Sequence, residues 1–171
     1  MNIEEELTDA IYEAGAIPEL WPQTLQKLSE LSDALGGLLF VTNMKTADWI
    51  ASDGIIEIVK KYFREGWADK NPRPRRLAAL RHAGFIHDLD VFSEEELKNE
   101  PVYQDFYRKV GFGWGAGTMF QMPSGDNVVF SFECSYETCP VRRETIERLD
   151  RLRPHLARAS LLTWRMGMRT S

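Results

Sequence analysis

The chain has 171 residues, of which 43% are hydrophobic and 27% charged, a composition typical of one folded soluble domain rather than of a disordered segment. Residues 140–171 hold eight arginines against three acidic residues and carry +5, so the formal net charge of −5 leaves −10 on the first 139 residues. An acidic body repels phosphate, which argues against DNA binding by this chain unaided, and no apolar run approaches the roughly 20 residues that span a bilayer.

Hydrophobic periodicity and turn residues divide the chain into helices and strands. In chain order we expect helices over 3–14 and 18–35, strands over 38–43 and 47–52, helices over 55–67 and 75–81, a strand over 85–88, a helix over 101–110, strands over 116–122 and 127–135, and a last helix over 142–166. The N-terminal segment Met1–Glu6 is acidic, whereas a secretory signal is basic and then apolar, so we expect a cytoplasmic protein.

The first strand predicts helical layers on both sides of a sheet. Leu38 and Phe40 share one face, and Leu39 and Val41 share the other. A strand that is apolar on both faces is covered on both sides. A short turn at residues 44–46 is expected to pair it with the next strand.

Several short segments mark where elements begin and end. Asn71–Pro74 ends the helix over 55–67, because proline cannot continue the helical hydrogen bonds. Ser93–Glu96 has the spacing of a capping box and begins another helical turn. Gly111–Gly117 precedes a strand, whereas a phosphate-binding loop opens a helix, so it is interpreted as a flexible strand entry at a sheet edge. Pro154 is expected to bend or split the last helix.

The last two strands read as a hairpin closed by Pro123–Asp126, whose proline and glycine favour a turn. The second of them alternates two sets of side chains, Val128, Phe130, Phe132 and Cys134 against Val129, Ser131 and Glu133. Hairpin connections are too short for parallel crossovers. The sequence therefore predicts an α+β fold, a five-stranded antiparallel sheet sandwiched between helical layers in the manner of PAS and GAF domains, with a long C-terminal helix.

No motif for catalysis or metal binding is found. The three histidines lack a metal-binding spacing, and Cys134 and Cys139 do not form a CxxC pair. The acidic runs Glu4–Glu6 and Glu94–Glu96 are consecutive, so their side chains point in different directions and cannot converge as an acid/base pair. We therefore expect neither an enzyme nor a bound metal or cofactor.

Aromatic residues give the more informative signal. Those expected to enclose one side of the sheet are Trp49, Tyr62, Phe63, Trp67, Phe85, Tyr103, Phe106 and Phe120. Any one of them can be simple core, but buried Tyr and Trp also need a polar partner. Together with Asn71, His87 and Ser131 they indicate a mostly apolar pocket with a few polar anchors.

Several stretches then resemble a known family in their order along the chain. They are Phe106–Thr118 with its spaced glycines, the turn Met122–Asp126, the strand Val128–Glu133, Tyr62 placed nine residues before Asn71-Pro72, and Leu152–Ala159. This order is similar to the autoinducer-binding domain of LuxR-type transcription regulators. The resemblance covers most of the chain and implies a ligand-sensing fold.

The resemblance also implies that several ligand-anchoring positions differ. Asn71 stands where the family has an Asp that accepts the amide N–H of an acyl-homoserine lactone, Ile58 replaces a Trp donor, Gly54 replaces a Tyr, and His87 replaces a pocket-wall Trp. Pocket positions with suitable chemistry are Tyr62, Tyr103 and Ser131. Each unpaired buried polar group of a lactone would cost about 1–3 kcal/mol. The ligand is therefore expected to be another small apolar or amphipathic molecule, unless side chains fill the pocket.

The candidate ligand-binding residues are Trp49, Ile58, Tyr62, Trp67, Asn71, His87, Tyr103, Phe106, Val129 and Ser131. Residues 1–139 are predicted to form the sensor domain, and 140–171 a linker and dimerisation helix packed on it. The apolar seam of this helix would either join two copies in a homodimer or pack on its own domain. DNA contact would need a helix-turn-helix that this chain lacks, either because it is an excised sensor domain or because it stands alone. The alternative function is a ligand-free dimerisation module that antagonises full-length regulators.

Overall fold

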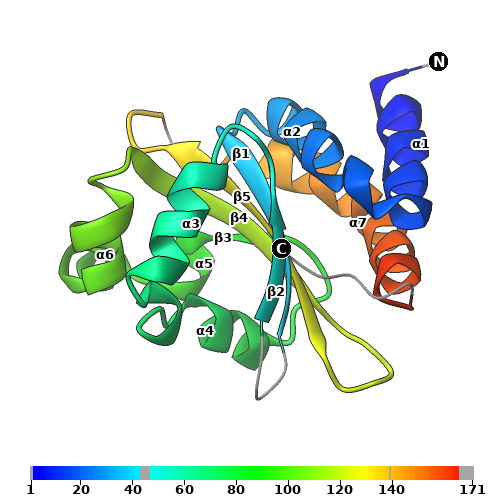
Figure 1. Cartoon of the computed structure of the whole chain (residues 1–171). Coiled ribbons are helices and arrows are strands. Elements are labelled where there is room, and N and C mark those ends of the chain that lie inside the picture. The colour runs from blue at the N-terminus through cyan, green and yellow to red at the C-terminus, as the bar shows by residue number, and fades with distance from the viewer. Residues whose placement is uncertain (1, 43–46, 139, 166–171) are drawn as a thin grey trace.

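Five strands pair antiparallel into the sheet at the centre of the molecule (Figure 1). They are β1 (Gly36–Thr42), β2 (Ala47–Ala51), β3 (Ile86–His87), β4 (Phe112–Gln121) and β5 (Asn127–Ser135), and their spatial order is β2-β1-β5-β4-β3. The computed structural model describes residues 2–42, 47–138 and 140–165, so the predicted turn at residues 44–46 and Cys139 lie outside the described residues.

Helices cover both faces of this sheet (Figure 1). They are α1 (Ile3–Ala16), α2 (Trp21–Leu31), α3 (Ile56–Arg64), α4 (Arg73–Leu80), α5 (Asp88–Val91), α6 (Glu94–Asn99) and α7 (Arg143–Arg165), with 3₁₀ turns η1 (Pro18–Leu20) and η2 (Trp67–Asp69) and a π-helical segment η3 (Val102–Tyr107). The predicted α+β fold, with an antiparallel sheet between helical layers and a long C-terminal helix, is therefore confirmed. Among the described residues, no helix has both the length and the apolar character that crossing a membrane requires.

The face covered by α1, α2 and α7 is a closed apolar core. The side chains of this core that are at most 1% exposed include Trp21, Leu25, Leu28, Phe130, Phe132, Leu149, Leu152, Leu156 and Ala159. Trp21 also donates its indole N–H to the Thr163 hydroxyl at 2.8 Å, which satisfies its polar atom inside this core.

The apolar seam of α7 thus belongs to the core of its own chain. Because Leu149, Leu152 and Leu156 are buried there, the interpretation of the seam as a contact between two copies is wrong. Pro154 lies inside α7 without splitting it. The helix predicted over 3–14 continues through Gly15 to Ala16, and a Cβ at Gly15 would come within 2.9 Å of the Ala159 carbonyl oxygen. Glycine at this position lets two helices approach closely.

The opposite face is covered by α3 to α6 and η3, and it carries most of the predicted aromatic cluster. Two residues assigned to that cluster lie on the first face instead. Phe85 packs on Phe132 with ring centroids 6.1 Å apart, and Phe120 packs on Phe130 at 6.2 Å. Side chains alternate along a strand, and the irregular pairing of β4 between Phe112 and Trp114 shifts that alternation.

Local chemistry explains the other boundaries. The helix predicted over 55–67 ends at Arg64 because Gly66 adopts a left-handed φ of 77°. The capping box at Ser93 is confirmed, with the Ser93 hydroxyl accepting from the Glu96 N–H at 3.1 Å. Part of the helix predicted over 101–110 is π-helical, which brings Tyr103 and Tyr107 to the same buried cluster.

Candidate ligand-binding site

A cavity of about 390 Å³ lies on this second face, between the sheet and the segments α3, α4 and η3. Its volume falls within the roughly 300–1,000 Å³ of known small-molecule pockets. The walls are mostly apolar, and charged side chains occupy one part of the lining. The cavity is therefore shaped for a small guest with one polar end.

Seven of the ten predicted binding residues line this cavity. They are Ile58, Tyr62, Asn71, His87, Phe106, Val129 and Ser131. Alternation along β5 places Val129 and Ser131 on the cavity side, as the sequence pattern predicted, while Phe130 enters the opposite core.

The other three stand one layer behind the lining residues. Trp49 stacks on Phe63, a cavity residue, with ring centroids 5.5 Å apart. Trp67 packs on Phe106 at 5.9 Å. Tyr103 is fully buried and donates its hydroxyl hydrogen to Asp88 Oδ1 at 2.9 Å. These three side chains support the wall but do not line the cavity.

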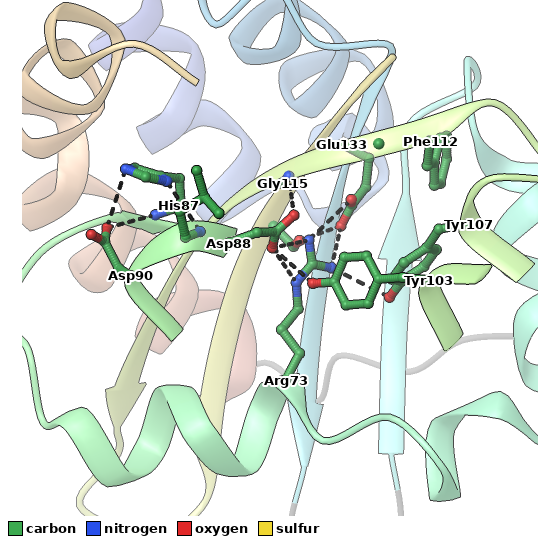
Figure 2. A network of polar contacts seen from close by, with 12 residues as sticks. Arg73, His87, Asp88, Asp90, Tyr103, Tyr107, Phe112, Gly115 and Glu133 are labelled. Carbon is green, nitrogen blue, oxygen red and sulfur yellow. Dashed lines mark hydrogen bonds and ion pairs between the residues drawn. The ribbon is translucent and has the colours of Figure 1, made fainter. Parts of the chain in front are cut away.

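Three charged side chains that were not among the predicted binding residues form a hydrogen-bonded part of the lining (Figure 2). Arg73 Nη1 and Nη2 donate to the two carboxylate oxygens of Glu133, at 2.8 and 3.2 Å. Arg73 Nε donates to Asp88 Oδ1 at 3.1 Å. We call Arg73, Asp88 and Glu133 the charged cluster. Such buried ions persist only when they are paired and hydrogen-bonded.

Each member of the cluster lies either at the first residue of a helix or on the cavity side of a strand. Arg73 is the first residue of α4 and directly follows its N-cap, Pro72. Asp88 opens α5, and Glu133 shares a face of β5 with Ser131. The Ser131 hydroxyl donates to Glu133 Oε1 at 2.7 Å, which fixes the carboxylate.

Gly115 on β4 makes room for the cluster (Figure 2). Its N–H donates to Asp88 Oδ2 at 2.8 Å. A Cβ at this position would overlap the Arg73 guanidinium. The glycine-rich stretch predicted as a strand entry at a sheet edge begins β4 at Phe112. Phe112–Gly115 pair with β5 alone, because β3 pairs only with Ala116 and Gly117, and Gly115 is needed here for close approach.

Burial governs ionisation within the cluster. Desolvation raises the pKa of Asp88 above its ordinary value, with Arg73 acting in the opposite direction. Burial also disfavours the charged form of Arg73, but Asp88 and Glu133 outweigh it and hold the Arg73 pKa well above its usual range. Loss of solvent raises the pKa of the Tyr103 and Tyr107 phenols as well, so both keep their protons at neutral pH.

Asn71 connects the charged cluster to two tyrosines. Its amide nitrogen donates to the hydroxyls of Tyr62 and Tyr107 at 3.0 and 2.9 Å. Its amide oxygen accepts from the Arg73 N–H at 3.0 Å, at the start of α4. Both hydrogens of the amide are thus engaged within the protein.

His87 has a local structural partner in addition to its place in the lining. Its Nδ1 accepts from the Leu89 N–H at 3.3 Å and so caps α5. The Asp90 carboxylate accepts from the His87 N–H at 3.1 Å. The first contact holds the ring at the cavity wall, and the second fixes the His87 backbone at the start of α5.

Comparison with solved structures identifies the fold. The ligand-binding domain of VqsR from Pseudomonas aeruginosa matches with a TM-score of 0.73 at 15% identity, covering 95% of this chain and 97% of that one. The N-acylhomoserine-lactone-dependent LuxR-family factor CepR2 from Burkholderia cenocepacia gives 0.71 at 14% identity and 96% coverage of both chains. The chain has the fold of a LuxR-type ligand-binding domain.

A third LuxR-type match extends beyond this domain. Escherichia coli SdiA gives a TM-score of 0.62 at 16% identity, with 90% of this chain matched to 64% of SdiA. SdiA in complex with octanoyl-rac-glycerol also matches, with a TM-score of 0.59. No protein-family model and no curated protein sequence matches the chain.

The positions singled out by the LuxR resemblance can now be placed. Ile58 lines the cavity with an apolar side chain that donates no hydrogen bond, and Gly54 does not line it. Gly54 instead donates its N–H to the Gln26 side chain at 3.1 Å and lies too close to the Leu35 carbonyl for any side chain. These two LuxR-type positions thus offer a ligand no polar group.

The sequence contained one usable signal for the charged cluster. Glu133 lies on the same strand face as Val129 and Ser131, and a carboxylate on a face expected to be buried needs a partner. Its partner Arg73, and Asp88, which shares that arginine, could not be predicted from spacing, since they are 60 and 45 residues away from Glu133 in sequence. Within the residues that the structure describes, no group of three or more potential metal ligands gathers.

Proposed function

We propose that this chain is the small-molecule-sensing domain of a LuxR-type regulator in the cytoplasm. The observation that carries the proposal is the cavity of about 390 Å³, whose lining joins apolar walls to one hydrogen-bonded polar cluster. A guest there would contact α3, α4, η3 and the sheet together. Binding would stabilise one arrangement of these segments over others, which is how a ligand shifts a regulatory equilibrium.

The ligand is proposed to differ from a standard acyl-homoserine lactone. Ile58 cannot donate to a lactone carbonyl, and at Asn71 a ligand N–H would meet a neutral amide oxygen that already accepts from the Arg73 N–H, in place of a free carboxylate. A polar group buried without a partner lowers affinity by about 1–3 kcal/mol. CepR2 is described as dependent on an N-acylhomoserine lactone and SdiA is found with octanoyl-rac-glycerol, so both molecules serve as reference probes.

Homodimerisation remains part of the proposal, through a surface other than the α7 seam. Light scattering coupled to size exclusion checks the homodimer: a mass of one chain at micromolar concentration contradicts it. A dimer whose cavity binds nothing supports the alternative of a ligand-free dimerisation module.

The acidic body is proposed to reach DNA only through a separate helix-turn-helix segment, since net charge of this sign repels phosphate.

The central experiment fills the cavity. In Val129→Phe the added ring enters the cavity from β5, whereas Met119→Phe is a matched control on a neighbouring strand, packed beside Val129 but outside the cavity lining. Native mass spectrometry of the purified chain is expected to show copurified mass in wild type and in Met119→Phe, but not in Val129→Phe. Thermal stabilisation by added small molecules should follow the same pattern. A response that Val129→Phe leaves intact contradicts binding in this cavity.

A further inference from the structure

We infer that the cavity selects an organic cation, such as a protonated amine carrying an apolar group, over neutral or anionic molecules of the same size. The inference rests on the proposed function, because it names the chemical class of guest for the same cavity. Three observations support it: the net charge of the lining, the hydrogen bonds that engage nearly all donors of its one arginine, and the aromatic walls.

The lining carries an excess of negative charge. Its ionisable side chains, counting histidine as neutral and leaving the phenols aside, are Asp69, Asp88 and Glu133 against Arg73. The balance is −2, and it remains −1 when Asp88 holds a proton. In a site of low dielectric this charge attracts a cation and repels a carboxylate or phosphate more strongly than it would in water.

The protein itself engages nearly every donor of the single arginine. A guanidinium has five N–H donors. Arg73 Nε donates to Asp88 at 3.1 Å, Nη1 donates to Glu133 and to the Tyr107 hydroxyl at 2.8 and 3.3 Å, and Nη2 donates to Glu133 at 3.2 Å. Nη2 also lies 3.1 Å from Asp88 Oδ1 as an ion pair. An anionic guest would therefore meet a guanidinium that two carboxylates already neutralise and that keeps at most one N–H without a hydrogen bond.

The acceptors, in contrast, are not exhausted. Glu133 Oε2 receives only Arg73 Nη2 among the described side chains, and a carboxylate oxygen accepts about two hydrogen bonds. The Glu133 side chain lines the cavity and keeps 8% of its surface exposed. An ammonium N–H can therefore reach a charged acceptor, and such charge-assisted hydrogen bonds are roughly twice as strong as neutral ones.

Aromatic rings form much of the remaining wall. The phenyl and phenol rings that line the cavity are Phe40, Tyr62, Phe63, Phe106, Tyr107 and Phe112. A cation over the face of an aromatic ring is attracted by the ring quadrupole, and more strongly when water is excluded. The apolar part of an amphipathic amine would be buried by the same surfaces.

The test compares three molecules with one hexyl chain: hexylamine, 1-hexanol and hexanoate. We expect calorimetric titration of the 171-residue chain to show hexylamine bound at least about tenfold more tightly than 1-hexanol, a difference that one charge-assisted hydrogen bond and a desolvated cation–π contact can supply. Hexanoate should bind most weakly. Adding salt should weaken hexylamine binding and leave 1-hexanol binding unchanged.

Two variants locate the charge effect. Glu133→Gln keeps an oxygen acceptor but removes the charge, so the preference for hexylamine over 1-hexanol should shrink about tenfold. Because Glu133 also holds Arg73, folding of this variant is checked by circular dichroism. Asp69→Asn changes an exposed side chain at the rim, for which no ion pair is found among the described residues, and it should reduce the preference about two- to threefold without affecting folding.

The outcomes separate the two proposals. If 1-hexanol or hexanoate binds as tightly as hexylamine, and Val129→Phe abolishes that binding, the cavity is a ligand site but the cation preference is wrong. If none of the three binds wild type, the cation preference is wrong, and copurified mass still decides the proposed function. If Val129→Phe changes neither probe binding nor copurified mass, the proposed function fails together with the inference.

Discussion

The two faces of the sheet are built on the same strands, but one packs into a closed apolar core and the other borders a cavity with buried charged groups. Toward α1, α2 and α7, β5 presents Phe130 and Phe132, which are completely buried in a closed apolar core. Toward α3 and α4 the same strand presents Ser131 and Glu133 beside a cavity. The first face gains stability from close packing, whereas the second gives up packing and must satisfy buried charge instead. The difference indicates that stability and recognition are divided between the faces.

Removing the arginine of the charged cluster should have the largest effect. Arg73→Met leaves Asp88 and Glu133 buried without a cation, and breaking such a pair costs about 3–5 kcal/mol at pH 7. Burial already raises the pKa of Asp88, and loss of the Arg73 charge that opposes this shift leaves its folded-state pKa further above the unfolded one. Stability is present below the unfolded pKa and falls as pH rises through the folded pKa. Urea unfolding should therefore show a smaller loss at pH 5 than at pH 7.

The matched control lies on the other face. Phe130→Ala removes a ring that packs on Trp21 and Phe120, and such truncations cost about 3–5 kcal/mol. No titratable group loses its partner, so this loss should be the same at pH 5 and pH 7. An equal loss for Arg73→Met at both pH values would remove the physical distinction between the faces.

Two glycines on β4 give a finer comparison within the second face. A Cβ at position 115 would overlap the Arg73 guanidinium, whereas a Cβ at position 117 meets only ordinary contacts, the nearest being the Phe130 carbonyl oxygen at 3.4 Å. Gly115→Ala should cost about 1–3 kcal/mol by overpacking, and Gly117→Ala less than about 0.5 kcal/mol. Thermal melts of both variants check this. A tolerated Gly115→Ala would mean that the cluster can shift without loss.

Sequence patterns predicted the layers of this fold better than they predicted the pairing of its buried charged side chains. Hairpin spacing and the alternation of Val129 and Ser131 along β5 depend on local geometry, which a single chain displays directly. The face of Phe120 was wrong because the irregular pairing near Trp114 shifts the alternation of β4, and a one-residue shift moves every side chain to the other face.

The charged cluster depends on contacts that local patterns do not encode. Arg73 stands between two prolines, so it was interpreted only as part of a helix break, and Asp88 as the end of a strand. Neither has a distinctive spacing relative to Glu133. The α7 seam was visible as a stripe, but periodicity alone does not say whether α1 or a second copy covers it. What covers a surface is decided by the three-dimensional arrangement.

The smallest effect expected for the charged cluster is a change in pH dependence, and Asp88→Asn tests whether the cluster carries more negative charge than the fold needs. The amide oxygen can accept from the Gly115 N–H or from Arg73 Nε and the Tyr103 hydroxyl, so one side loses its acceptor, while Arg73 keeps Glu133 as its counterion. In wild type, burial places the folded-state pKa of Asp88 above its ordinary value. The folded chain therefore binds more protons than the unfolded chain across that window, and this group makes stability fall as pH rises.

Asp88→Asn should remove that contribution, so its stability relative to wild type should improve as pH rises from 4 to 7. Chemical denaturation of both proteins over this range measures the difference, and Ser93→Ala, remote from the cluster, is the control for a general loss of helix capping. A constant difference would mean that Asp88 titrates alike in both states, and that Arg73 compensates both carboxylates fully. The negative charge would then be structural rather than available to a guest, and the contrast between the two faces would reduce to one of packing.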